Sequence, residues 1–310
     1  MEWFKGLNVG VQAAIISAAV SIFLYILGAL VNWFREKYML SYKLKKEYTF
    51  NQKMHIKERL AKSKTPLIKA AEDLNYRLWD FSVNIDKGWH RNNDQEIQTP
   101  FYGYYLKSFV YRLLSFFYWI DKAENDIYDF DFSLADKSDQ VYVKYVKTME
   151  NFFCEKLLIK DLIADNPEDS SHHFYKNVLS YFISYMENDG RLLTFDQFTS
   201  KVENDFSPIG SVFSYIREIQ NNKDDPKYNI IISFHLFLML FLNKYGLDYQ
   251  QTDRKKFHDI VEKKYKDKIV IKKELLSFLE QNKILNEMTW IRKELNIKTN
   301  RNSFFATINK

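Results

Sequence analysis

The chain has 310 residues, 46% of them hydrophobic and 17% aromatic, so it is long and apolar enough to bury a substantial core. Its 8 glycines and 5 prolines argue against sandwiches, barrels and glycine-rich phosphate loops, and its single cysteine, Cys154, excludes an internal disulfide framework and a multi-cysteine zinc site. The net charge of +5 is small, but the charges are segregated into basic, acidic and basic segments along the chain.

The first segment is apolar enough to cross a membrane. Residues 9–34 carry no charged side chain, and as a helix they would measure about 39 Å, against a hydrocarbon core of about 30 Å. The eight residues before them contain one Glu and one Lys, which differs from the basic start of a cleaved signal peptide. The sequence therefore predicts one N-terminal transmembrane anchor, residues 1–34, that contacts the lipid bilayer through residues 9–34.

Residues 35–64 are predicted to form a basic juxtamembrane stalk. They contain ten Lys and Arg and three Glu, a net charge of +7, whereas residues 1–34 have a net charge of zero. Because basic flanks are retained in the cytoplasm, we expect the N-terminus outside the inner membrane and residues 35–310 inside the cell. The stalk is also expected to attract anionic lipid head groups. Small residues four apart in the anchor, Gly10, Ala14 and Ala18, leave self-association open.

Residues 65–250 are predicted to form an acidic helical bundle. They contain 19 basic and 28 acidic residues, a net charge of −9. Thr65-Pro66 is typical of a helix start, with Thr as the N-cap and Pro at the first helical position. Apolar residues then recur at spacings of three and four as far as Ile85. A polar loop is predicted over residues 88–100, and an almost wholly apolar central helix over 101–127.

The rest of the bundle is predicted to be helical as well, over residues 141–163, 174–186, 212–219 and 230–242. Thr194 and Gln197 have the spacing of a capping box at the start of a further helix. The apolar stretch 230–242 has 13 residues and would measure about 20 Å, which is too short to cross a membrane, so we expect a buried core helix.

Residues 251–310 are predicted to form a basic helical C-terminal appendage. They contain 15 basic and 8 acidic residues, a net charge of +7. A short strand is predicted over 269–271. The chain as a whole is predicted to be all-α, with a single N-terminal transmembrane helix followed by a cytoplasmic helical bundle.

One charged cluster stands out on the first helix of the bundle. Asp73, Arg77 and Asp80 are four and three residues apart and therefore share one side of a helix. We interpret Asp73 and Arg77 as an ion pair that fixes packing, and an acid–base cluster of an unrecognised enzyme is the alternative. We assign no catalytic residue, cofactor or metal site. The adjacent His172 and His173 are expected to be exposed.

The segment from Pro66 to Phe81 reads Pro-Leu-Ile-Lys-Ala-Ala-Glu-Asp-Leu-Asn-Tyr-Arg-Leu-Trp-Asp-Phe. It resembles the P-L-x-x-A-A-x-D-L-x-x-R-L segment of a family of uncharacterised bacterial single-span membrane proteins. In that family the segment follows a transmembrane helix and a basic stalk and precedes a strongly aromatic helix. Family members often have Gln-His where this chain has Phe234-His235. The resemblance covers roughly residues 10–250, and it implies fold and topology but no activity.

These observations lead us to expect a membrane-tethered cytoplasmic interaction module, such as an adaptor, a sensor or a stress or defence effector, with an unknown protein partner. An enzyme that uses Asp73, Arg77 and Asp80, a pore built on the first helix, and nucleic-acid binding through the basic tail are the alternatives. The nucleic-acid alternative is disfavoured because the acidic body competes for the tail and repels phosphate.

Overall fold

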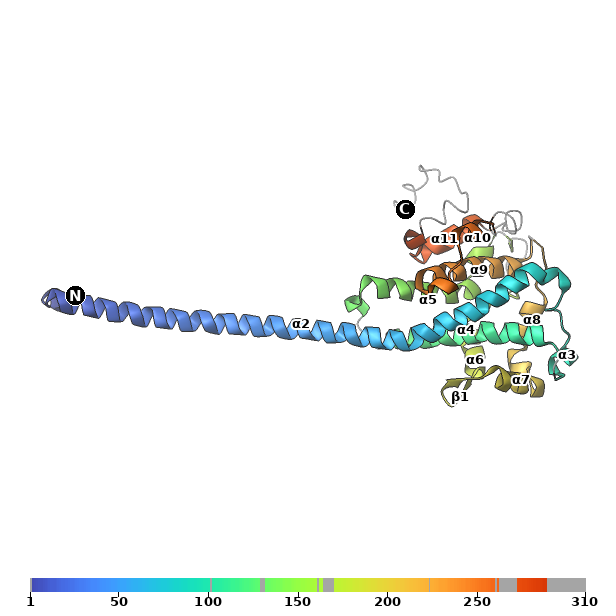
Figure 1. Cartoon of the computed structure of the whole chain (residues 1–310), viewed down its shortest axis with the longest axis horizontal. Coiled ribbons are helices and arrows are strands. Elements are labelled where there is room, and N and C mark those ends of the chain that lie inside the picture. The colour runs from blue at the N-terminus through green and yellow to red at the C-terminus, as the bar shows by residue number, and fades with distance from the viewer. Residues whose placement is uncertain are drawn as a thin grey trace. The chain divides into compact units, whose positions relative to one another are not determined.

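The computed structural model describes residues 2–100, 102–128, 132–160, 162–163, 170–222, 224–259, 261 and 272–288. The chain divides into two compact units, residues 1–55 and 56–310. Over the described ranges nearly all regular structure is helical (Figure 1), and the strands among them form one antiparallel pair, β1 (Glu187–Asn188) and β2 (Arg191–Leu192). The predicted all-α class is confirmed.

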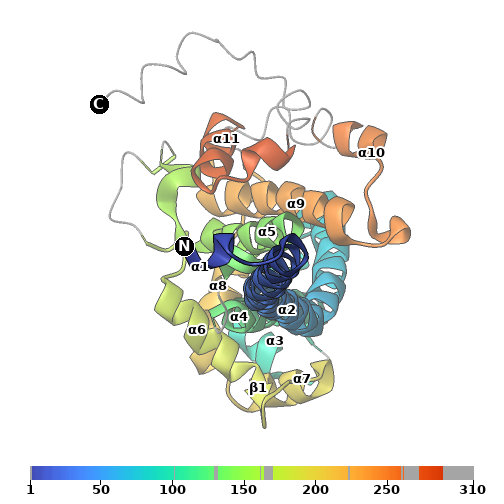
Figure 2. The same ribbon diagram turned by 90° about the vertical axis from the view of Figure 1, so that its left-hand side faces the viewer.

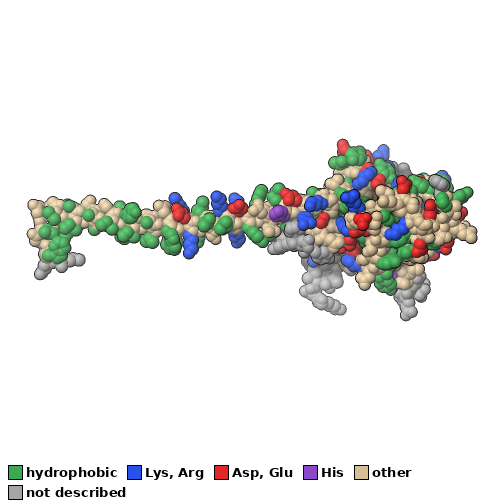
Figure 3. Space-filling model, turned by 90° about the horizontal axis from the view of Figure 1, so that it is seen from below, with side chains coloured by type: hydrophobic (Ala, Val, Ile, Leu, Met, Phe, Trp, Pro, Cys, Tyr) green, Lys and Arg blue, Asp and Glu red, His purple; other side chains and the backbone are tan. Residues whose placement is uncertain are grey.

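The first unit contains the short helix α1 (Glu2–Lys5) and the beginning of α2 (Val9–Asn84), which continues into the second unit. Within the described chain, one helix is long and apolar enough to cross a membrane, and its apolar part lies near the N-terminus. The large hydrophobic side chains of this N-terminal part, such as Ile22 and Phe23, are exposed. On the face drawn in Figure 3, the N-terminal part of α2 shows hydrophobic side chains, and the Lys and Arg side chains begin further along it.

Helix α2 passes through Pro66 without interruption, so the helix start predicted at Thr65-Pro66 is wrong. A proline inside a helix cannot donate a backbone hydrogen bond, which weakens the helix at that turn. However, Ile56 and Leu60 before the proline and Leu67 after it are all buried in the same hydrophobic core. Burial on both sides favours one continuous helix over a break. The second unit begins at Ile56, whereas the sequence placed the boundary between stalk and bundle at residue 64.

The core of the second unit is formed by helices that pack around α4 and α9. Helix α4 (Tyr104–Tyr128) contacts α5 (Lys137–Cys154), α6 (Lys176–Tyr185), α7 (Phe195–Asn204) and α8 (Gly210–Arg217), and α9 (Pro226–Tyr245) contacts α5. Every residue from Lys227 to Leu242 is buried. The prediction of a buried core helix over 230–242 is confirmed.

One connection and one helix differ from the sequence prediction. The polar segment 88–100 contains a short helix, α3 (Asp94–Gln98), whose N-terminus is capped by a capping box between Asn93 and Glu96. The helix predicted over 141–163 starts earlier, at Lys137, and ends at Cys154.

The capping box predicted at the start of α7 is confirmed, because Thr194 and Gln197 form reciprocal hydrogen bonds. Short 3-10 helices complete the connections, at Ile85–Lys87, Phe132–Leu134, Lys156–Ile159, Ser207–Ile209, Asp248–Gln250 and Leu285–Met288.

The described part of the C-terminal appendage packs on the bundle. It contains α10 (Arg254–Asp259) and α11 (Lys272–Gln281), both of which appear beside the bundle helices in Figure 2. The rings of Phe278 and Phe152 have centroids 4.6 Å apart. The side-chain amide of Asn151 donates to Asn282 over 2.8 Å. The strand predicted over 269–271 lies outside the described residues.

Candidate functional site

The charged cluster found in the sequence lies between α2 and α4, but its pairing differs from the prediction. The Arg77 side chain is 8% exposed and lies 3.5 Å from the carboxylate of Asp80. Its guanidinium donates to the hydroxyl of Ser108 and lies 4.2 Å from the ring centroid of Tyr105. Asp73 instead pairs with Lys69 at 3.2 Å. The predicted pair of Asp73 and Arg77 is therefore wrong, because the buried guanidinium bonds to groups on the neighbouring helix.

A second arginine, Arg112, belongs to the same cluster, and sequence reasoning missed it. Its guanidinium donates to the backbone carbonyl of Asp73 over 3.0 Å. Burial, and then the charge of Arg77, lower the pKa of Arg112. Burial, and then the charge of Asp80, raise the pKa of the Tyr105 phenol, so this group stays protonated at neutral pH. The signal available in the sequence was a charged residue flanked by the apolar residues Val110, Leu113 and Leu114.

These contacts indicate that the cluster ties α2 to α4. Asp80 also accepts a hydrogen bond of 2.8 Å from Asn84, so both acids of the predicted trio have partners. A carboxylate that acts as a general base must reach a substrate proton in a plausible pose. Here Asp73 pairs with Lys69, and Asp80 pairs with Arg77 and Asn84. The arrangement therefore supports the packing interpretation better than the enzymatic one.

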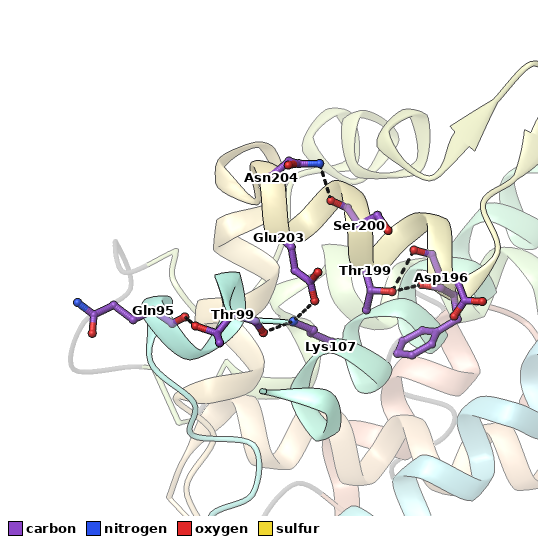
Figure 4. A network of polar contacts seen from close by, with 9 residues as sticks. Gln95, Thr99, Lys107, Asp196, Thr199, Ser200, Glu203 and Asn204 are labelled. Atoms are coloured by element: carbon purple, nitrogen blue, oxygen red, sulfur yellow. Dashed lines mark hydrogen bonds and ion pairs between the residues drawn. The ribbon is translucent and has the colours of Figure 1, made fainter. Parts of the chain in front are cut away.

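A pocket of about 310 Å³ lies between the start of α4 and one side of α7. Lys107 of α4 lines this pocket and is buried. Its ammonium donates to the Thr99 carbonyl over 3.1 Å and to the Glu203 carboxylate over 2.7 Å. Figure 4 shows the ammonium between these two oxygens, with Thr199 and Asp196 further along α7. The Lys107 side chain is 2% exposed and that of Glu203 is 23% exposed. The ion pair therefore joins α4 to α7 and leaves part of the carboxylate accessible.

The remaining lining of this pocket is aromatic and polar. It consists of Pro100, Tyr102, Tyr104, Phe195, Asp196, Thr199 and Ser200. Tyr102 and Tyr104 are largely exposed, whereas Phe195 is partly buried against the core. Sequence reasoning found the capping box of α7 but not this pocket, because its residues come from segments about 90 positions apart that only tertiary packing brings together.

Three histidines and the cysteine pack among other side chains of the domain. His172 and His173 are buried, with their Nδ1 atoms 3.0 Å apart, so the expectation that they are exposed is wrong. His235 is buried in α9 and packs edge-on against Trp79, with ring centroids 5.2 Å apart. Burial raises the pKa of the Cys154 thiol to about 12, which keeps it protonated at neutral pH and makes it a poor nucleophile.

Among the residues that the structure describes, no group of three or more His, Cys, Asp and Glu side chains is placed to hold a metal ion. The search against protein-family models, the search of curated proteins and the search of solved structures found no match to this chain. The geometry thus defines an all-α protein with an N-terminal helix long and apolar enough to cross a membrane, and with a pocket between α4 and α7.

Proposed function

We propose that this chain is a membrane-tethered interaction module, held in a bacterial inner membrane by one N-terminal helix, with its helical domain in the cytoplasm. The observation that carries the proposal is the charge asymmetry around the uncharged residues 9–34. The preceding residues have no net charge and the following 30 residues have a net charge of +7. Retention of basic flanks in the cytoplasm would place the domain inside.

The exposure of this stretch supports a lipid environment. Large side chains such as Ile22, Phe23 and Leu27 are about half or more exposed along α2. A continuous apolar surface of this kind is unfavourable in water and favourable in the hydrocarbon of a bilayer. The basic stalk that follows would add attraction to anionic head groups of the cytoplasmic leaflet. The resemblance of residues 66–81 to bacterial single-span proteins supports the same topology.

The site geometry favours binding over catalysis as the role of the domain. Arg77, the centre of the charged cluster, donates a hydrogen bond to Ser108 and packs on the ring of Tyr105, both on α4. The pocket between α4 and α7 has the small size and mixed aromatic and polar lining of a recognition site. An adaptor, a sensor or a stress or defence effector that acts through a protein partner fits these features. An enzyme that uses Asp73, Arg77 and Asp80 is the second candidate, with weaker support.

The membrane part of the proposal is tested by deletion and by topology reporters. Deleting residues 1–34 should move the protein from the membrane fraction to the soluble fraction, because it removes the apolar stretch. A reporter fused after Lys310 should report a cytoplasmic position, and one fused before Met1 an external position. Digestion of the C-terminal reporter by a protease added outside the inner membrane would contradict the proposed orientation.

The interaction part is tested by crosslinking in native membranes. A photocrosslinker placed at exposed Tyr102, beside the pocket, should capture a protein partner that a crosslinker at exposed Tyr249, outside the lining, does not capture. Equal capture at both positions, or capture of lipid alone, would contradict a specific protein interaction.

A further inference from the structure

We propose that the pocket between α4 and α7 binds an organic cation, the guanidinium or ammonium group of an Arg or Lys side chain in a basic segment of a protein partner. The inference rests on the proposed function, because it assigns a recognition site to the interaction module. It follows from the size, the charge and the aromatic lining of the pocket.

The size of the pocket suits one side chain. Its volume of about 310 Å³ lies at the lower end of the range of small-molecule sites. The lining comes from the segment before α4, from the first turns of α4 and from one side of α7. A long, unbranched side chain with a charged end can enter such a recess, whereas a folded surface cannot.

The charge of the lining selects a cation. Two carboxylates, Asp196 and Glu203, line the pocket together with one cation, Lys107. The charge of Lys107 is already compensated, because its ammonium lies 2.7 Å from Glu203 and 3.1 Å from the Thr99 carbonyl. Asp196 is exposed at the first turn of α7. An entering anion would face two carboxylates, whereas an entering cation gains an unneutralised one and the remaining acceptor capacity of Glu203.

The aromatic lining adds a second preference for a cation. Ring faces carry partial negative charge and attract Lys or Arg groups within about 6 Å. Tyr104 and Phe195 already form an edge-to-face pair, with centroids 5.7 Å apart. Phe195 also contacts Tyr111, with ring centroids 5.3 Å apart, and the Tyr111 hydroxyl donates to the Leu193 carbonyl over 2.9 Å. These contacts hold the rings in place before a ligand arrives.

The backbone beside Tyr102 is also constrained. Gly103 has a φ of +64°, and a Cβ at this position would lie 3.3 Å from the carbonyl oxygen of Glu96 in α3. Any other residue would be strained there, because L-residues rarely adopt this conformation. Gly103 thus keeps the segment before α4 close to α3, next to the mouth of the pocket.

The test measures binding of small probes to the full chain in detergent micelles by ligand-observed NMR or calorimetry. N-acetyl-arginine amide and N-acetyl-lysine amide should bind. N-acetyl-citrulline amide has nearly the shape of the arginine probe but no charge, and it should bind at least fivefold more weakly. Binding of the charged probes should weaken with added salt, because the attraction is partly between exposed charges.

Two substitutions locate the site. Asp196→Asn and Tyr104→Ala should each weaken binding of the arginine probe about two- to fivefold, the range expected for one exposed cation contact. Both side chains are exposed, so both variants should stay folded; Asp196→Asn should keep the melting temperature of the original chain, whereas Tyr104→Ala should lower it slightly because the ring contact with Phe195 is lost. Asp189→Asn is the matched control: Asp189 is exposed outside the lining, and its φ of 51° is one that Asn also adopts. It should bind the probe unchanged.

Three results would overturn the inference: no binding of either charged probe, equal binding of the citrulline probe, or undiminished binding by both pocket variants. Choline chloride provides the lipid head-group arm. Stronger binding of choline than of the arginine probe would replace the peptide occupant with a lipid. These outcomes are independent of membrane fractionation, so failure of the pocket and failure of the membrane anchor can be told apart.

Discussion

Arg77 shows how one buried residue depends on groups far away in sequence. Its guanidinium bonds to Ser108, 31 positions along the chain, and lies over the ring of Tyr105. Spacing along one helix identifies neighbours on that helix, so the sequence suggested Asp73 as the partner and could not reveal Ser108. The link between Lys107 and Glu203, 96 positions apart, was hidden for the same reason.

We expect Arg77→Ala to destabilise the domain by about 1–3 kcal/mol, because the change removes a buried charged hydrogen bond and the packing of the guanidinium on Tyr105. Asp73→Asn is the control and should cost less than about 0.5 kcal/mol, since Asp73 is half exposed and pairs with an exposed lysine. Chemical denaturation followed by circular dichroism measures both. If Arg77→Ala abolishes a cellular activity while its unfolding curve is unchanged, the enzymatic alternative gains over the packing role.

The elements that the sequence predicted well are those with the strongest apolar character. Helices α4 and α9 were located within a few residues, because both contain long runs of apolar residues whose burial follows directly. Helix α3 was missed because four of its five residues are polar and it depends on the local capping box of Asn93 and Glu96. The pocket was missed entirely, because its lining combines three segments. Local patterns therefore predicted the buried helices better than the site.

Pro66 offers a test at the scale of a single helix. Because α2 is continuous through this position, Pro66→Ala should restore a backbone hydrogen bond and raise the free energy of unfolding, by up to about 3 kcal/mol. Thr65→Ala should have little effect, since an exposed residue inside a helix has no capping role. Thermal unfolding of the two variants measures both changes in stability. If a helix started at Thr65 instead, Thr65→Ala would cost about 1 kcal/mol and Pro66→Ala would bring no gain.

At the scale of the whole molecule, the described part of the basic tail packs on the acidic bundle. Residues 65–250 carry −9 and residues 251–310 carry +7. The described part of the tail is attached to the bundle by apolar contacts, since Phe257 and Phe278 belong to the common core. Lys256 adds a cation contact, 4.6 Å from the ring centroid of Trp79. A basic segment that is partly folded onto an acidic body is less accessible to other polyanions.

This packing leads to a prediction about nucleic acids. The second unit, residues 56–310, should bind duplex DNA or RNA only weakly at about 0.15 M salt, because its acidic body repels phosphate. The residual binding should show no sequence preference and should fall steeply as salt rises, as expected when basic side chains merely displace counterions. Fluorescence anisotropy with several labelled duplexes over a salt series measures both properties. Tight binding to one sequence would mean that the tail presents its cations outward, and nucleic-acid recognition would then replace the protein interaction as the better account of this domain.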